Sequence, residues 1–596
     1  MPEINPKINI KSATTKVGRK TLGGRTVATM DFFRLLPTFA MEVQPHDDLH
    51  INLSAFTRCE ALVKPVFAET RQENRFFFIP YRVVFPHWND FINGTRSAVN
   101  GGTTIYTPFV PTLSFRSMCK EFIDGGFGSN SFTTSSGASE TSHDIFKQSS
   151  NGTYQYYRLT TVGRHVFSVL RGIGYNICGY SEQTSSKQYQ RFNNYSPSVL
   201  PLLAYCKVII DYYFPTSFDD STRNRFSGLI DSTLGMSRQF TASDFLFCLQ
   251  IVGLYTYYKQ DYFTAGMQNP MGNPLGAGAS ASFSVPVDNV GDYQESVRTD
   301  QNAVVEDISS DDTISQYGLS VLKGLSDAIM RFVKAGFRPA DRYKARFGID
   351  LPDANLNMSS YLGKSIQELM ISDVMCNADS QGASIGEYAG KGVFTQRDKD
   401  NIHFRTEEYG FLVCISQILP KIGYVQGQPR YVLHTQRYDF FSPEFDMAGN
   451  QMTAYSELFN DFQTKQRAEL DTSKATDGFN FMPRYAETKV GRDMLLGDAI
   501  VPTRAANFSS YHLFRVFDWS YAASPTIPTE FNLSFLSTSD RESYDRIFYV
   551  TDGSIDNFTS ILYFDVTGYR DGCSLFENYD FDGARDVQIL EQSAHM

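Results

Sequence analysis

The strand-like segments of this chain lie near its two ends, far apart in the sequence. Near the start, LHINLSAFTRCEALVKPVF (49–67) alternates apolar and polar residues, as a strand with one buried face does. Beyond residue 400 such runs return, namely YGFLVCISQIL, RYVLHTQRYDFF, YHLFRVFDW, RIFYV and SILYFDV. We therefore predict a β-domain, a sandwich or jelly roll, whose strands come from both ends of the chain and pair over long sequence distances.

Aromatic side chains crowd RFFFIPYRVVFPHWNDFINGT (75–95), where an expected strand leads into an Asn-Gly turn. Aromatic residues make up 14% of the chain, with 49 Phe and 34 Tyr against 2 Trp, and this excess favours β-structure and contact surfaces. Taken alone, the run predicts an ordinary core strand.

The middle of the chain has a different character. Residues 125–144 and 147–155 are rich in Gly, Ser, Thr and Asn and predict loops, as does the stretch 266–286. The apolar clusters 200–214 and 244–263 fit either a buried helix or a strand. The clearest predicted helix runs from Asp312 or Thr313 to Gly336, with apolar residues every three or four positions: Ile314, Tyr317, Val321, Leu325, Ala328, Ile329 and Phe332.

Charge separates the first residues from the rest. The formal net charge of −11 argues against a protein coated in basic residues for nucleic acid. The first 25 residues have the opposite balance, with six basic side chains against Glu3, and we expect a basic arm that contacts phosphate without reading sequence. The candidate nucleic-acid-binding residues are Lys7, Lys11, Lys16, Arg19, Lys20 and Arg25.

Residues with catalytic or metal-binding chemistry are scattered. The eight cysteines stand singly, as buried hydrophobes of a reducing compartment do, and the start of the chain lacks the apolar core of a signal peptide. His46 and His50 are four residues apart, but Pro45 and the strand context favour a surface turn over a metal-binding helix. His403 and Glu407 share this spacing and precede a strand. We expect no catalytic residue, no cofactor and no metal site.

Several stretches, taken in order, resemble the major capsid protein of microviruses, the small icosahedral single-stranded DNA bacteriophages. The strongest likeness is RFFFIPYRVVFPHWNDFING, with TMDFFRLLP and FAMEVQPHDDLHINLSAF before it. Further blocks follow: LPLLAYCKVIIDYYF, KQDYFTAGMQNP, RYKARFGIDLPDANLNMSSYLG, YGFLVCISQILPKIGYVQGQPR, RYDFFSPEF, FMPRYAETK and DRIFYVTDGSIDNF. The likeness spans residues 29–95 and 200–560, whereas 96–199 carries extra length that departs from the family pattern.

The resemblance implies a mainly β fold, an eight-stranded antiparallel viral jelly roll with long α-helical and loop insertions between strands. It implies a structural protein, not an enzyme, that forms pentamers and then a 60-subunit T=1 shell around packaged single-stranded DNA. Its expected partners are small DNA-binding, pilot and scaffolding proteins of the phage and a host cell surface receptor. The expected location is the virion, assembled in the host bacterial cytoplasm.

On this basis the chain divides into five parts. We expect a basic N-terminal arm (1–25), the first jelly-roll strands (26–95), interstrand insertions with helices and surface loops (96–312), a helix and extended connection (313–399), and the last jelly-roll strands with a C-terminal tail (400–596). The alternative from another class is a carbohydrate-binding or carbohydrate-active β-sandwich protein, because aromatics and polar loops also suit glycan recognition. A general nucleic-acid-binding protein remains an alternative only for the arm.

Overall fold

A computed structural model of the chain describes residues 17–571 apart from several segments. The longer segments left out are 99–104, 136–145, 176–194, 215–219, 254–260, 267–338, 373–390, 397–401, 458–477, 498–510, 516–543 and 550–555, and shorter breaks lie between them. The helix predicted over 313–336 lies outside the described residues, as does nearly all of 266–286. Within the part that is described, no helix is long and apolar enough to cross a membrane.

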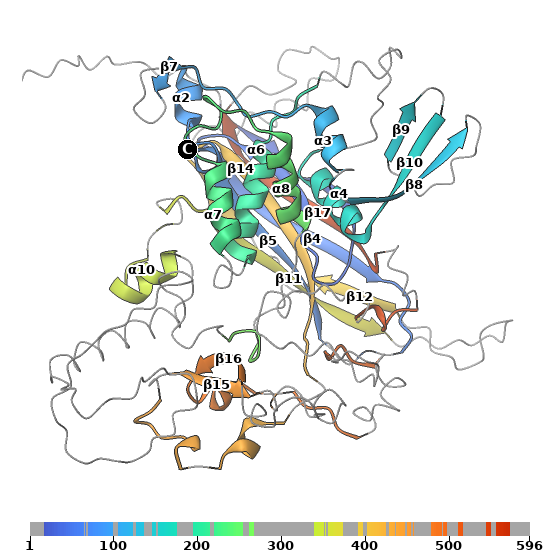
Figure 1. Cartoon of the computed structure of the whole chain (residues 1–596), viewed down its shortest axis with the longest axis vertical. Helices are drawn as coiled ribbons and strands as arrows, with labels where there is room; N and C mark the ends of the chain where they lie inside the picture. The colour runs from blue at the N-terminus through green and yellow to red at the C-terminus, as the bar shows by residue number, and fades with distance from the viewer. Residues whose placement is uncertain are drawn as a thin grey trace, which may run out of the picture.

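One ten-stranded antiparallel sheet dominates the fold (Figure 1). It joins the two ends of the chain, because β17 lies between β4 on one side and β1 and β2 on the other. The strand order is β1 (Val17–Thr21), β17 (Phe558–Asp571), β4 (Asp48–Cys59), β12 (Lys391–Gln396), β11 (Ser360–Ser372), β5 (Thr70–Pro80), β14 (Gly410–Pro420) and β3 (Leu36–Val43), with β13 (Ile402–Arg405) also paired to β4 and β2 (Gly24–Met30) to β17. The prediction of a mainly β fold with strongly non-local strand pairing is confirmed.

The sheet folds over on itself, so that two halves face each other. One half contains β2, β17, β4 and the β12/β13 segment, and the other contains β3, β14, β5 and β11. Aromatic pairs cross the interior: Phe39 and Phe564 stack with ring centroids 4.7 Å apart, and Phe78 lies 4.8 Å from Phe404. A single buried cluster of β3, β4, β5, β13, β14 and β17 side chains fills the space, and burial of each Phe contributes roughly 1.5–3 kcal/mol.

Helices cover the other face of β5 and β14. The helices packed there are α1 (Tyr81–Val84), α3 (Phe115–Phe122), α4 (Thr161–Gly172), α6 (Leu200–Val208) and α8 (Ala242–Gly253), while α7 (Asp220–Leu229) lies beside them (Figure 1). Phe76 and Phe78 point into the sandwich, and Phe77 and Ile79 point into the helical layer. A strand buried on both faces reads as an unbroken apolar run, which explains the crowded aromatics in this part of the sequence.

The apolar cluster 200–214 is helical. Its residues form α6 and then one π-helical segment, η3 (Ile209–Tyr213). Nearly every α6 side chain is buried, so the helix has no polar face and no periodicity that would separate it from a buried strand. Asp211 in the middle of η3 accepts hydrogen bonds from the backbone N–H and the hydroxyl of Ser359, which holds η3 to the residue just before β11.

Smaller elements lie outside the main sheet. They are α2 (Trp88–Asn93), α10 (Pro339–Phe347), the short 3-10 helix η9 (Ala486–Thr488), the two-stranded sheets β6 (Ser97–Ala98) with β7 (Ile105–Tyr106) and β15 (Asn450–Ala454) with β16 (Gly478–Pro483), and the three-stranded sheet β8 (Gly128–Ser135), β10 (Thr153–Leu159) and β9 (Phe146–Ser150).

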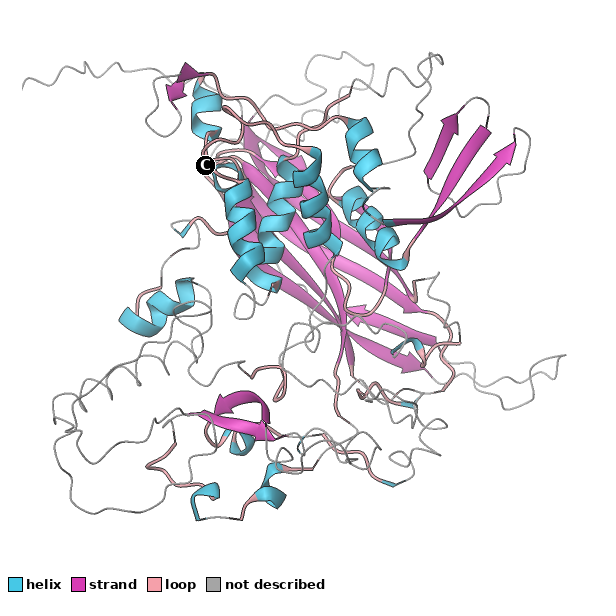
Figure 2. Ribbon diagram, viewed as in Figure 1, coloured by secondary structure: helices cyan, strands magenta, loops and turns pink. Residues whose placement is uncertain are grey.

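Three predictions of local structure were wrong. The stretch predicted as loop over 125–155 contains β8, β9 and the first three residues of β10, because Thr, Phe and Tyr between its polar residues support cross-strand pairing (Figure 2). RYVLHTQRYDFF forms two 3-10 helices, η5 (Arg430–Leu433) and η6 (Arg437–Asp439), and RIFYV forms a turn with one bridge. RYVLHTQRYDFF has strand composition, but composition alone supplies no partner for backbone hydrogen bonds. RIFYV does find one over a short stretch: Phe548 forms an antiparallel bridge with Leu62, and the backbones of Ile547 and Tyr549 bond to Val63 and Ala61. The expected helix and connection (313–399) also supplies two central strands, β11 and β12.

Candidate functional site

The sheet has one exposed face that combines apolar and basic side chains. On β2, Val27 is 61% exposed, and Tyr563 of β17 is 49% exposed. Arg25 lies opposite Tyr563 in the strand register with its guanidinium 5.6 Å from the ring centroid, and Arg58 lies 5.0 Å from the ring of Phe56 on β4. Val27, Phe56 and Tyr563 lie on one face of neighbouring strands, which makes this face a candidate contact surface.

The six predicted phosphate-binding residues do not all lie in the described chain. Lys7, Lys11 and Lys16 lie outside the described residues, and Arg19 belongs to β1 although its side chain is not described. Lys20 is half-buried on β1, and Arg25 is exposed on β2. Strand β1 therefore starts at Val17, inside the range expected to be an arm.

A chain of buried hydrogen bonds crosses the sandwich. It begins on β3, where the hydroxyl of Thr38 lies 2.7 Å from that of Ser416, and Ser416 donates to the Asn74 carbonyl oxygen at 2.6 Å. Asn74 accepts from the amide of Gln72 at 3.3 Å, and Gln72 in turn accepts from Thr57 on the opposite half at 2.6 Å. The chain ends at Ser560 of β17, whose hydroxyl lies 2.6 Å from that of Thr57. None of these side chains was predicted from the sequence. Each strand contributes only one or two of the hydrogen-bonded residues, so no single stretch of sequence shows the network.

Buried charges are paired at two further places. Asp47 is fully buried in the turn after β3 and accepts hydrogen bonds from Arg570 of β17, with the shortest contact at 2.6 Å. Arg570 also donates to the Glu42 carbonyl oxygen at 2.9 Å. On β5, the buried Glu73 carboxylate contacts Arg71 at 2.9 Å and Arg75 at 2.5 Å. Burial alone would raise the pKa of Glu73, but the adjacent arginines outweigh it and hold that pKa below its usual value.

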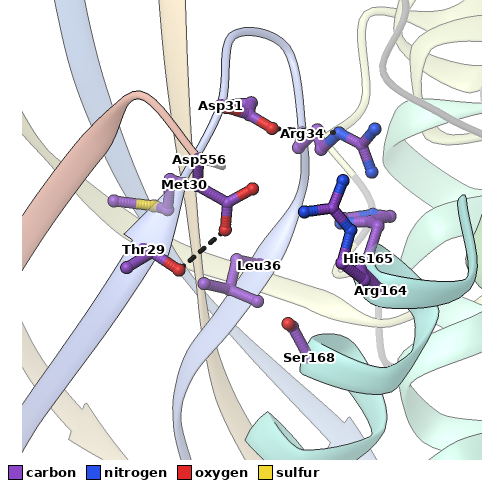
Figure 3. A pocket seen from close by; sticks show the side chains of 9 residues that line it. All are labelled: Thr29, Met30, Asp31, Arg34, Leu36, Arg164, His165, Ser168 and Asp556. Atoms are coloured by element: carbon purple, nitrogen blue, oxygen red, sulfur yellow. Dashed lines mark hydrogen bonds and ion pairs between the residues drawn. The ribbon is translucent and has the colours of Figure 1, made fainter. Parts of the chain in front are cut away.

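A small polar pocket lies where β2, the start of β3 and α4 meet (Figure 3). Arg34, Arg164 and His165 face Asp31 and Asp556 across it. Its volume is about 20 Å³, which holds one water molecule and no substrate. Burial, reinforced by the charge of Arg34, lowers the pKa of His165 to about 3, so this imidazole is neutral at physiological pH.

A larger groove of about 370 Å³ lies beside α2. Trp88 and Tyr409 pack edge to face at 5.7 Å on its wall. Its carboxylates, Glu407 and Glu408, are neighbours in one turn, and Glu408 is held by Arg82 at 2.7 Å. Carboxylates that act together in glycoside hydrolysis flank the scissile bond from two sides, an arrangement that this pair does not have.

The histidines singled out by spacing are paired differently in the structure. His46 occupies the turn before β4 with a φ of 71°, which confirms the expected turn. His50 lies instead beside His403 of β13, which is opposite it in the strand register, and the Nε2 atom of His403 is 2.5 Å from Oδ1 of Asp48. Glu407 lies outside this group of three. Strand alternation placed Asp48 and His50 on one face, a signal that the sequence did contain.

Comparison with known proteins gives one family and two relatives. The family model described as capsid protein (F protein) matches residues 8–124 and 189–572, more than half of the chain. Capsid protein VP1 of Chlamydia phage 1 is 24% identical over 594 residues, covering 85% of this chain and 87% of the relative. Capsid protein VP1 of Bdellovibrio phage phiMH2K is 31% identical over 99 residues, covering 16% of this chain and 18% of the relative.

Proposed function

The chain belongs to the capsid protein (F protein) family, the major capsid proteins of microviruses, and from this membership we propose how it builds a shell. It is a structural protein of a bacteriophage and not an enzyme, as the family and both relatives are capsid proteins. The resemblance seen in the ordered sequence blocks is thereby confirmed. The carbohydrate-active alternative is set aside.

We propose that the two halves of the sheet are the two four-stranded sheets of a viral jelly roll. One would be β2–β17–β4–β12/β13 and the other β3–β14–β5–β11, with β1 added at the edge. Support comes from the connections. Among the strands of the main sheet, β4 and β5 are consecutive yet lie in opposite halves, and so do β2 and β3, β11 and β12, and β14 and β17. Such alternation gives two Greek keys.

We propose that copies of this fold form pentamers and then a closed T=1 shell of 60 subunits, located in the virion. The observation that carries this is the exposed face formed by Val27, Phe56 and Tyr563, which offers apolar area to a neighbouring subunit. A head-to-tail contact that closes on a rotation axis makes rings such as pentamers. The test is sedimentation and electron microscopy of the purified full-length chain with its phage partners supplied. Closed particles or pentamers are expected, and a monomer at every concentration would contradict the proposal.

We further propose that the shell encloses single-stranded DNA, with the basic N-terminal residues on its inner side. Support comes from the charge contrast between an acidic chain and its basic start. If all six side chains met phosphates, the slope of log affinity against log salt would be roughly −0.7 times six, or about −4. The proposed partners are small DNA-binding, pilot and scaffolding proteins of the phage and a receptor on the host cell surface. The proposed place of assembly is the host cytoplasm.

The DNA proposal is best tested by substitution, because deleting residues 1–25 would also remove β1, whose five residues pair with β17. One variant changes Lys7, Lys11 and Lys16 to Ser, and a second changes Lys20 and Arg25 to Ser. Both should reduce packaged DNA and flatten the salt slope in proportion to the charges removed. An unchanged slope and unchanged packaging in both variants would refute the role.

A further inference from the structure

Three side chains with metal-binding chemistry converge on the outer face of the strand pair β4 and β13. The pair is antiparallel, with His403 directly opposite His50. Their rings stack with centroids 4.6 Å apart and an interplanar angle of 19°. Asp48 lies two residues before His50 and therefore on the same face of β4. One ligand atom from each of the three lies within 4.8 Å of the others.

We propose that Asp48, His50 and His403 bind a divalent first-row transition metal ion, with Zn²⁺ as the principal occupant. Two imidazole nitrogens and one carboxylate oxygen suit zinc, whereas calcium and magnesium take oxygen ligands. Ligand atoms on tetrahedral zinc are about 3.4 Å apart, given metal–ligand distances near 2.1 Å. Coordination would require the stacked rings of His50 and His403 to turn so that one nitrogen of each points at the ion.

The backbone holds these ligands in place. Leu49, Ile51 and Ile402 alternate with them and are buried in the sandwich, so the same pleat that anchors the strands directs the three polar side chains outward. The His403 side chain is 56% exposed and that of Asp48 is 33% exposed, which leaves an entry path for a hydrated ion. Three protein ligands leave a fourth position for water.

Charge in the cluster suits a cation. The carboxylate of Asp48 lies beside two imidazoles, and its Oδ1 atom is 2.5 Å from Nε2 of His403. A metal ion would be held between these same two atoms. Arg405 lies opposite Asp48 in the register and is exposed, so its guanidinium has room to turn toward solvent.

Metal binding would join β13 to β4. Strand β13 has four residues and so few hydrogen bonds of its own, while β4 is a central strand of 12 residues. The ion would add a cross-link next to the turn that holds Asp47 against Arg570. We therefore expect metal to raise the thermal stability of the chain.

The experiment uses the untagged full-length protein, freed of metal with a chelator. Co²⁺ is added and its visible d–d absorption followed, and Zn²⁺ is then used to displace it. The expected result is one Co²⁺ per chain, released by Zn²⁺, with a rise in melting temperature. His50→Ala, His403→Ala and the conservative Asp48→Asn should each weaken binding at least tenfold, because even loss of a group that only supports a ligand costs about 10–100-fold.

Two matched controls come from the pairs that share the four-residue spacing. His46→Asn keeps a side chain that tolerates the positive φ at this position, and Glu407→Gln keeps the size of an exposed side chain. Both should bind Co²⁺ like the unmodified protein. Circular dichroism confirms that each variant is folded. Absence of d–d bands in the unmodified protein, or equal binding by folded His50→Ala and His403→Ala, would overturn the proposal.

Discussion

Thr57 donates a hydrogen bond to the side-chain carbonyl of Gln72 across the interior of the sandwich, at 2.6 Å. Thr57 belongs to β4 and Gln72 to β5, so the bond joins the two halves of the sheet face to face. Because a hydroxyl has one proton, the hydroxyl of Ser560 must be the donor in its 2.6 Å contact with Thr57. These buried polar groups restrict how the two halves can slide, since a shift would leave them without partners.

Thr57→Val should destabilise the fold by about 1–3 kcal/mol, because the buried Gln72 oxygen loses its donor while the volume is kept. The free energy of unfolding in urea measures this. Adding Gln72→Leu should recover part of the loss, as both polar partners are then gone. Ser54→Ala, an exposed site on the same strand, should change the free energy by less than about 0.5 kcal/mol. A loss in Ser54→Ala as large as in Thr57→Val would count against the bond.

Asp47→Ala should cost about 3–5 kcal/mol, because it leaves the Arg570 guanidinium, which is only 15% exposed, without its counter-charge. The matched control is Asp350→Ala, which breaks an ion pair with Lys344 whose side chains are 76% and 64% exposed. Water screens that exposed pair, so its loss should change the free energy of unfolding much less. Equal losses in the two variants, measured by chemical denaturation, would contradict the structural role of Asp47.

Glu73 should make the chain sensitive to acid. Its pKa is lowered in the folded state, so it contributes stability above its ordinary pKa of 4.5, and this contribution is lost as pH falls through the lower folded value. Denaturation curves between pH 7 and pH 3 should therefore show a steeper loss for the unmodified chain than for Glu73→Gln. If the unmodified chain and Glu73→Gln lost stability in parallel as pH fell, the ion pairs of Glu73 with Arg71 and Arg75 would not contribute to stability.

His165 should act in the same direction over a higher pH window. Its pKa falls from 6.5 to about 3 on folding, so the unfolded chain binds the proton more readily and stability declines as pH drops below 6.5. His165→Gln keeps a neutral polar side chain and should flatten the profile between pH 6.5 and pH 3. A profile that keeps its slope in this variant would assign the decline to other groups.

The exposed sheet face should be needed for assembly but not for folding. Val27→Asp and Tyr563→Asp place charge on an apolar contact surface and should shift the protein from particles to smaller species in sedimentation. Circular dichroism should be unchanged, because both side chains are already about half exposed or more. Normal particles from both variants would remove this face from the proposed subunit contact.

Limited proteolysis of particles should cut first between β8 and β10. In the structure their three-stranded sheet projects away from the main sheet beyond α4 (Figure 2), and we propose that it lies on the outer surface of the shell. Mass spectrometry of early fragments locates the cuts within Gly125–Tyr154. Complete protection in particles, with cleavage in the unassembled chain, would place this sheet at a subunit contact or on the inside.

The sequence by itself determined where the core strands lie and to which family the chain belongs. β5 and β14 are continuous apolar runs, and β4 alternates apolar with polar residues. Both patterns reflect which side chains are buried, and both can be recognised in a short stretch of sequence. The ordered blocks pointed to a microvirus capsid protein without any coordinates. Runs such as RYVLHTQRYDFF misled for the same reason, since strand composition is local and strand pairing is not.

Only the tertiary structure decided which residues meet. His50 and His403, Asp47 and Arg570, and Thr57 and Gln72 each come together because strands from distant parts of the chain align in register. Strand register is set by burial of whole sheet faces, so the apolar residues of two strands determine which polar residues lie opposite each other. Spacing along the chain suggested His46 with His50 and His403 with Glu407, which a helix would have brought together. In a sheet, the nearest side chains on the same face belong to the paired strand, and spacing along the sequence does not predict which residues these are.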